Sequence, residues 1–304
     1  MTRTRRFLGA HESVAGGLHT AFERIRQVGG TALQIFTRNQ RQWEAPPVSP
    51  DEAREFAAAW AAWGDYPVAS HASYLVNPAS PDDALWRRSI AALAQELERC
   101  RSLRIPWVVL HPGARTGSGL EEALARAAAC VDAALDMADG QGELPLILLE
   151  NTAGQGTALG GALEHLSGIV ALSRHPDRLG LCLDTCHAFV AGYDLRTPAG
   201  LEATLDGMDL ARLKLVHVND TKGGLGSHLD RHEHIGQGSI GLEGFRAVLN
   251  HPALAGLPMV LETHKEKDLK EDLENLATLR TLLEDSCRDF EKHEYVFQNL
   301  INGF

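Results

Sequence analysis

Short apolar runs recur along the chain and alternate with longer segments of helical periodicity. The segments between them are rich in Ala, Leu, Arg and Glu and carry apolar residues at helical spacing, as in 82–103 and 121–138. The eight runs cover residues 7–11, 31–36, 67–73, 107–113, 146–153, 179–187, 213–220 and 258–264. Their starts fall 24 to 45 residues apart, as a strand, a helix and two loops require. Eight such units in series predict an α/β fold, a single-domain (β/α)8 TIM barrel.

No break in composition marks a second domain, so we expect one barrel domain over residues 1–285. Residues 286–304 form a C-terminal extension that holds four of the chain's thirteen Phe and Tyr residues, and the sequence assigns it no role. There is no apolar run of about 18 residues or more, so no membrane span is expected. The N-terminus is basic but lacks the apolar stretch of a secretory signal, which favours a cytoplasmic location.

Side chains of metal-binding type stand at or near the C-terminal ends of six different runs. They are His71, His111, Glu150, Asp184, His217 and Glu262. A single His in such a place is usually structural, because a buried imidazole readily finds a hydrogen-bond partner. Six strands that all end this way are not expected by chance, and this face of a barrel carries the active site. The pattern predicts a site for zinc or similar divalent ions.

Three further residues extend this set. Asp230 and His232 are two positions apart, so their side chains point the same way if the segment is extended. With His187 they can form another three-ligand site. Glu150 can bridge two ions, with one carboxylate oxygen on each. The residues therefore predict several metal ions close together, with Asp184 and His187 serving different ions.

Other motifs have weaker claims. On an extended strand Cys186 would share a side with Asp184, which would allow a thiolate ligand, but we interpret it as a small buried residue. Residues 236–241 read GQGSIG and match a dinucleotide-binding fingerprint, yet a loop precedes them where a strand is required. We interpret these glycines as a loop that lets a phosphate backbone come close. His11 and His234 could border the site, although structural roles are favoured for both.

Charge and cysteine content narrow the function classes. The net charge is −11, which argues against a simple basic nucleic-acid-binding protein. If four of the acids bind three divalent ions, six positive charges reduce −11 to −5, and the metal face can be positive while the outside is acidic. The five cysteines are scattered, so neither a disulfide framework nor a zinc ribbon is expected.

Seven motifs, taken in order, resemble those of the endonuclease IV family of apurinic/apyrimidinic endonucleases. They are HASYLVN, HPG, LENTAGQG, CLDTCHAFVAGYDLRTP, HVNDTK, DRHEHIGQG and LET, and the likeness spans about residues 7–285. The resemblance implies a TIM barrel with three zinc ions per chain. It assigns one zinc to His71, His111 and Glu150, a second to Glu150, Asp184, His217 and Glu262, and a third to His187, Asp230 and His232. It also implies catalytic roles for Glu150 and Glu262.

Two segments resemble the loops with which this family distorts DNA. FTRNQRQW (36–43) and HASYL (71–75) place Arg41, Gln42 and Tyr74 as the wedge, whereas the alternative for the first segment is an ordinary solvated loop. Arg can enter a narrowed minor groove, and Tyr can fill the gap left by a missing base. The resemblance implies a monomer that cuts double-stranded DNA 5′ to abasic sites, leaving 3′-hydroxyl and 5′-deoxyribose phosphate ends. It also implies removal of 3′-blocking groups, in base excision repair.

Two other functions stay open. A sugar isomerase or epimerase shares the barrel and the divalent metals, but it needs only one or two ions and a pocket that encloses a sugar. That function leaves residues 230–232 and the loop 36–43 without a purpose. A non-catalytic protein that binds damaged DNA is a third interpretation, and the complete set of metal ligands argues against it.

Overall fold

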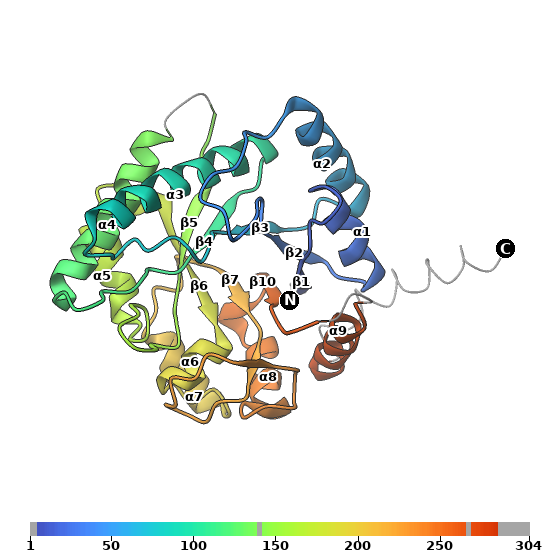
Figure 1. Cartoon of the computed structure of the whole chain (residues 1–304). Coiled ribbons are helices and arrows are strands. Elements are labelled where there is room, and N and C mark those ends of the chain that lie inside the picture. Colours follow the sequence, from blue (N-terminus) through green and yellow to red (C-terminus); the bar gives the residue numbers. More distant parts are fainter. Residues whose placement is uncertain (1–4, 139–141, 266–268, 285–304) are drawn as a thin grey trace.

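Eight parallel strands close into a barrel, and helices surround it (Figure 1). The computed structural model describes residues 5–138, 142–265 and 269–284. The barrel strands are β1 (Phe7–Glu12), β2 (Ala32–Ile35), β3 (Val68–His71), β4 (Trp107–Leu110), β5 (Leu146–Glu150), β6 (Leu179–Asp184), β7 (Leu213–His217) and β10 (Pro258–Leu261). β1 pairs with both β2 and β10 and so closes the ring. The predicted (β/α)8 barrel is confirmed, and each predicted run falls on a barrel strand.

Helices lie on the outside of the barrel (Figure 1). They are α1 (Thr20–Gln27), α2 (Pro50–Trp63), α3 (Asp83–Leu103), α4 (Leu120–Met137), α5 (Glu164–Leu172), α6 (Thr185–Ala191), α7 (Pro198–Asp206), α8 (Gly241–Asn250) and α9 (Lys270–Leu282). Local sequence sets their ends. Before α2, the Ser49 hydroxyl accepts a hydrogen bond from the N–H of Glu52, and the Glu52 carboxylate accepts one from the N–H of Ser49. None of the helices in the described ranges has the length and apolar character needed to cross a membrane.

Seven of the eight barrel strands, all except β1, end before the C-terminal end of their predicted run. The sequence predicts an extended run as far as residue 187, but β6 ends at Asp184. The Asp184 carboxylate accepts a hydrogen bond from the N–H of His187 at 2.7 Å and caps α6. The expectation that Cys186 lies on the strand beside Asp184 is therefore wrong, because the capping carboxylate starts a helix at once.

A separate apolar layer fills the inside of the barrel. Its buried residues are Ala32, Ala69, Val109, Leu148, Cys182, Leu215 and Val260, with Phe7, Trp107 and Leu146 packed against them. A larger apolar core lies between the strands and the helices. Because successive side chains of a strand point to opposite faces, the residue two positions beyond each interior residue also points into the barrel. This alternation prepares a second layer at the C-terminal ends of the strands.

A two-stranded ribbon rises from the same end of the barrel. β8 (Asp220–Thr221) follows β7 closely and pairs in antiparallel fashion with β9 (His232–Glu233). The pairing brings His232 back beside the residues that end the barrel strands. The expected tail, 286–304, and the expected domain limit at residue 285 lie outside the described residues.

Candidate metal centre

A ring of polar side chains lies directly above the interior apolar layer. Each member stands two residues beyond an interior residue, as strand alternation requires. The pairs are Ala32 and Gln34, Ala69 and His71, Val109 and His111, Leu148 and Glu150, Cys182 and Asp184, Leu215 and His217, and Val260 and Glu262. The six strand-end residues expected from the sequence thus belong to one layer. Gln34 is a seventh member, which the sequence analysis does not single out.

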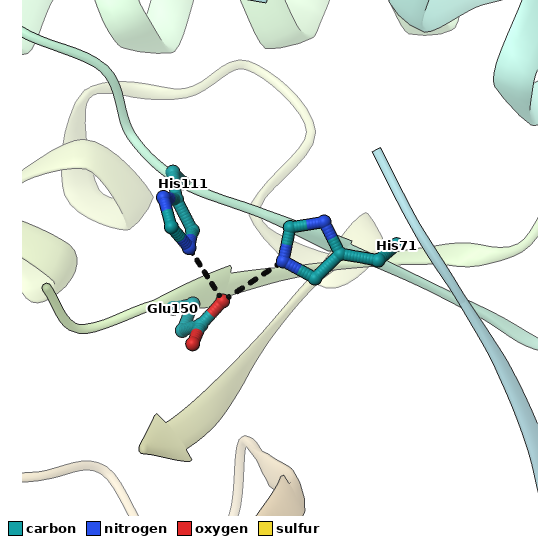
Figure 2. Close-up of side chains that lie close together, drawn as sticks. All are labelled: His71, His111 and Glu150. Carbon is teal, nitrogen blue, oxygen red and sulfur yellow. Dashed lines mark hydrogen bonds and ion pairs between the residues drawn. The ribbon is translucent and has the colours of Figure 1, made fainter. Parts of the chain in front are cut away.

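The imidazoles of His71 and His111 both point at one carboxylate oxygen of Glu150 (Figure 2). Oε2 of Glu150 lies 3.0 Å from Nε2 of His111 and 3.3 Å from Nε2 of His71. His71 and Glu150 are buried, and His111 is partly exposed. Two imidazole nitrogens and one carboxylate oxygen that face a single point suit a metal ion with one side open to substrate.

A second group of possible ligands shares Glu150 with the first. Its other oxygen, Oε1, lies 2.9 Å from Nδ1 of His217. The same nitrogen lies 3.2 Å from Oε2 of Glu262 and 3.7 Å from Oδ2 of Asp184. The ligand atoms of all four residues lie within 4.8 Å of one another. Glu150 thus presents one oxygen to each group, which is the arrangement that a bridging carboxylate needs.

His187, Asp230 and His232 lie together although they come from different elements. Oδ1 of Asp230 is 3.5 Å from Nε2 of His187 and 3.7 Å from Nε2 of His232. Oδ2 of Asp184 also reaches this group, at 3.9 Å from Nε2 of His232. Cys186 offers a ligand atom within 4.8 Å of those of Asp230 and His232. The structure brings the expected trio together and adds two neighbours, Asp184 and Cys186, that the sequence does not assign to it.

The imidazole rings are turned so that one nitrogen of each is available. Nδ1 of His71, His187 and His232 lies 2.7, 2.9 and 3.0 Å, respectively, from a backbone carbonyl oxygen. Each carbonyl accepts a hydrogen bond from Nδ1, which leaves the lone pair on Nε2. Nε2 of His232 is buried and has no hydrogen-bond partner among the described residues. Lone pairs that face other acceptors need a cation between them, so these residues fit divalent metal ions.

Electrostatics in the cluster also favour cations. Burial alone would lower the pKa of His187, but the surrounding carboxylates, Asp184 first, outweigh it and raise that pKa well above its usual value. The pKa of His232 rises to about 10 because its contacts with Cys186 and Asp184 outweigh burial. Burial would raise the pKa of Glu150, yet the imidazoles around it hold that pKa well below its usual range. Protons held this tightly mark places where a metal ion can replace them.

Two buried amides position the ligands of the second group. The Gln34 side chain accepts a hydrogen bond from Nε2 of His217 at 2.9 Å and donates one to Oε1 of Glu262 at 2.6 Å. The Asn219 amide donates to Oδ2 of Asp184 at 2.6 Å. The sequence does carry a signal for Gln34, because it is a polar residue inside an apolar run and stands in register with the ligands.

His11 and His234, which the sequence places only at the border of the site, differ in their contacts. Nδ1 of His11 lies 3.0 Å from Nε2 of Gln34 and 3.5 Å from Oε1 of Glu262, so His11 borders the second group. His234 accepts a hydrogen bond from the amide of Asn275 on α9 at 3.0 Å. Its ring therefore joins α9 to the segment that follows β9.

The three residues expected to contact DNA are exposed beside the metal centre. They are Arg41, Gln42 and Tyr74. Tyr74 is 62% exposed, and its ring centroid lies 5.3 Å from that of His71 and 5.8 Å from that of His111. The Ser73 hydroxyl donates to the carbonyl oxygen of Gln40 at 3.0 Å, which joins the two loops that carry these residues. A cavity of about 380 Å³ opens next to Tyr74 and the first group.

The glycine-rich segment 236–241 surrounds a carboxylate of the protein itself. Asp220 accepts hydrogen bonds from the N–H groups of Gly236, Gly238 and Ile240 at 3.0 Å and of Gly241 at 3.3 Å. A Cβ on Gly238 would lie 2.4 Å from the carbonyl oxygen of Thr221, so only glycine permits this approach. The expectation that these glycines admit a phosphate backbone is wrong, because Asp220 already occupies the N–H groups that a phosphate would need.

Comparisons with known proteins show which sequences the chain is similar to. A sequence model of the family described as xylose isomerase-like TIM barrel matches residues 22–279. The chain is 50% identical over 280 residues to a protein of Chloroflexus aurantiacus named probable endonuclease 4, and the match covers 91% of this chain and 98% of that one. A protein of the same name from Methanoculleus marisnigri is 46% identical over 279 residues, covering 90% of this chain and 98% of its own.

Solved structures show the same barrel. Endonuclease IV from Thermus thermophilus has a TM-score of 0.80 at 38% identity, and the match covers 91% of this chain and 98% of that chain. A D-tagatose 3-epimerase-like protein has a TM-score of 0.67 at 22% identity, with 91% and 98% covered. At that identity the likeness to the epimerase-like protein shows a common fold alone.

Proposed function

The chain belongs to the endonuclease IV family of TIM-barrel proteins, and from this premise we propose that it is a zinc-dependent DNA repair endonuclease. It hydrolyses the phosphodiester 5′ to an abasic site and leaves a 3′-hydroxyl and a 5′-deoxyribose phosphate. The same chemistry removes groups that block 3′ ends, in base excision repair. We expect a monomer that acts on double-stranded DNA in the cytoplasm.

The environment of Glu150 is the observation that carries this proposal. One carboxylate oxygen faces Nε2 of His71 and of His111, and the other faces Nδ1 of His217. A fully buried carboxylate with imidazoles on both sides is poorly suited to one ion and well suited to two. A bridged pair of ions is a common arrangement for phosphodiester hydrolysis.

Three zinc ions would be held by the three groups of side chains. We assign His71, His111 and Glu150 to the first, Glu150, Asp184, His217 and Glu262 to the second, and His187, Asp230 and His232 to the third. Zinc held there would supply a Lewis acid, which would lower the pKa of water toward neutrality and neutralise charge on the phosphate. The protein keeps Glu150 and Glu262, our catalytic assignments, ionised, because nearby imidazoles lower both pKa values against the effect of burial.

The rim of the centre supports selection of an abasic site. Tyr74 and the adjacent cavity of about 380 Å³ lie next to the first group, so a sugar extruded from the duplex would meet the ligands of that group. A nucleotide without a base is extruded more easily, because no stacking or pairing is lost. Arg41 and Gln42, on the neighbouring loop, are exposed and able to enter a groove of the duplex.

The decisive experiment uses one duplex in two forms, with a single abasic site and intact. We expect cleavage of the abasic form alone, with a 3′ end that a polymerase extends directly. Removal of metal by a chelator should abolish cleavage, and zinc should restore it. Cleavage 3′ to the site, or binding without cleavage, would contradict the proposal. Epimerisation of a ketose without DNA cleavage would favour the sugar-enzyme alternative, for which the third group has no purpose.

A further inference from the structure

The loop that carries Arg41 and Gln42 is held against one face of helix α3. This loop, residues 36–49, connects β2 to α2. The α3 residues that bond to it or stack on it are Arg88, Ala92, Gln95, Glu96 and Arg99, and their spacing places them on one face of a helix. We infer that Arg99 and Glu96 are positioning residues that hold this loop in the form that recognises damage, an inference that rests on the proposed function.

Arg99 ties the two ends of the loop together. Its side chain is buried, with 7% of the residue exposed. Nη2 donates to the carbonyl oxygen of Thr37 at 2.5 Å, Nε donates to the Thr37 hydroxyl at 3.1 Å, and Nη1 donates to the carbonyl oxygen of Pro46. Thr37 lies near the start of the loop and Pro46 near its end. The planar fork of a guanidinium can reach both carbonyls at once, whereas an ammonium is a single point of charge.

Glu96 links the loop to the strand that carries a metal ligand. Its Oε1 accepts hydrogen bonds from the Thr37 hydroxyl at 2.8 Å and from the Ser70 hydroxyl at 2.5 Å. Its Oε2 lies 3.4 Å from Nε of Arg38. Ser70 immediately precedes His71 in β3, so a single buried carboxylate fixes the loop relative to the first metal group.

The middle of the loop is secured as well. Arg38 donates to the carbonyl oxygen of Trp43 at 3.1 Å and to that of Ala92 at 2.8 Å. The Arg88 guanidinium lies 4.2 Å from the centroid of the Trp43 ring, in a cation–π contact. The loop therefore keeps Arg41 exposed between these contacts. Its backbone is therefore ordered before DNA arrives, and binding does not have to supply that ordering.

Loss of a buried charged network can destabilise the whole protein, so the test must separate the position of the loop from the stability of the fold. The matched control is Asp132→Asn. Asp132 is a buried carboxylate on α4 that accepts hydrogen bonds from the Ser173 hydroxyl at 2.5 Å and from the N–H of Arg174 at 3.0 Å. These residues lead into β6, at the end of the barrel opposite the metal centre. The control weakens a network around another buried carboxylate, and this network touches no part of the loop.

The experiment measures Kd for a duplex with one abasic site and for the same duplex intact, in wild type, Arg99→Met, Arg99→Lys and Asp132→Asn. Arg99→Met should weaken abasic binding by about tenfold or more, because the loop must then be ordered on binding. Binding of the intact duplex, which depends mainly on phosphate contacts, should change by less than about twofold. Arg99→Lys should lie between, and Asp132→Asn should lower the thermal unfolding temperature without changing either Kd.

Two further measurements make the positioning role specific. Trypsin should cleave after Arg41 faster in Arg99→Met than in Asp132→Asn, and zinc content should be equal in all variants. In an Arg41→Ala background, Arg99→Met should cost less than about threefold in abasic binding, because its effect passes through Arg41.

Several results would overturn the inference. They are fully additive effects of the two substitutions, zinc loss that accompanies the loss of affinity, and an equal change in Asp132→Asn. A wild-type protein that does not distinguish the two duplexes would overturn the proposed function and this inference together. A wild type that distinguishes them, beside an Arg99→Met variant with unchanged Kd values, would overturn the inference alone.

Discussion

Two clusters of buried polar groups lie at the mouth of the barrel, and they differ in whether their atoms find partners within the protein. In the metal centre, carboxylate oxygens and imidazole nitrogens face one another, and Nε2 of His232 has no hydrogen-bond partner among the described residues. Around Asp220, five N–H groups point at one carboxylate and each is hydrogen-bonded to it. We call the first the open cluster, because its acceptors need cations as partners. We call the second, around Asp220, the closed cluster, because its donors and acceptors already satisfy one another.

The comparison shows why residue types alone misjudge such places. The segment 236–241 matches a known ligand-binding fingerprint letter by letter, whereas the proposed metal ligands are spread from residue 71 to residue 262. What separates the two is the balance of donors and acceptors. An excess of acceptors in a buried place indicates a site suited to a cation, and a balanced set of donors and acceptors indicates a structural role.

The largest effect is expected where the open cluster loses its shared ligand. Glu150→Ala removes a ligand from two groups, so about one of three zinc ions should remain, whereas Asp230→Ala should leave about two. Cleavage should fall by at least about 10²-fold in both variants. The barrel should survive, because its interior apolar layer lies below the ligands. Elemental analysis and turnover measure this, and equal metal loss in the two variants would show that the groups are divided wrongly.

In the closed cluster, a substitution should lower the stability of the fold more than it lowers the zinc content. Asp220→Asn replaces an acceptor with an amide that presents N–H groups to other N–H groups, and a buried donor without a partner costs about 1–3 kcal/mol. We expect the free energy of unfolding to fall by about 2–4 kcal/mol while the first two groups keep their zinc. Denaturant unfolding and zinc content provide the measurement. If Asp220→Asn lost as much zinc as Glu150→Ala, the contrast between the clusters would be wrong.

Glu12 is an intermediate case, because it is buried with a cation nearby but without a hydrogen bond to either oxygen in the described part of the chain. Nζ of Lys265 lies 3.4 Å from its Oε2 and is shared with Asp272. Burial raises the pKa of Glu12 to about 7, against the opposing effect of Lys265. A carboxyl with a raised pKa binds more protons when folded, so its contribution is favourable at low pH and is lost as the pH rises from about 4.5 through 7.

Glu12→Gln should remove this pH dependence. Relative to wild type, the variant should gain about 2–3 kcal/mol in free energy of unfolding between about pH 4.5 and pH 8, since one pKa unit corresponds to about 1.4 kcal/mol. Unfolding curves of both proteins over that range measure the difference. Parallel curves would mean that Glu12 is already paired well enough to be ionised at no cost, as in the Asp220 cluster.

Sequence patterns predicted the barrel and the layer of polar residues at its strand ends for a physical reason. A strand places alternate residues inside, so His71, Glu150 and Glu262 had to share a layer once eight strands were recognised. Helix α6 was not predicted, because an aspartate such as Asp184 can be a metal ligand, a helix N-cap or both. Only its contacts in the folded chain show that it caps a helix. The anchoring of residues 36–49 by Arg99 could not be foreseen, because Thr37 and Arg99 are 62 positions apart and no local period links them.

Gln34 is the position where the smallest effect is expected, and it tests whether the open cluster depends on its supports. The amide is not a preferred zinc ligand, but it orients His217 and Glu262, and loss of such a partner typically weakens metal affinity by about 10–100-fold. Gln34→Ala should therefore bind three zinc ions at saturation yet release one to a competing chelator at a lower concentration than wild type does. Gln42→Ala, an exposed amide on the same face that touches no ligand, is the matched control and should behave as wild type. Identical chelator titrations for Gln34→Ala and Gln42→Ala would mean that the ligands hold their own orientation. In that case the ring of strand ends would be sufficient for the site, and the contrast with the Asp220 cluster would rest on the ligands alone.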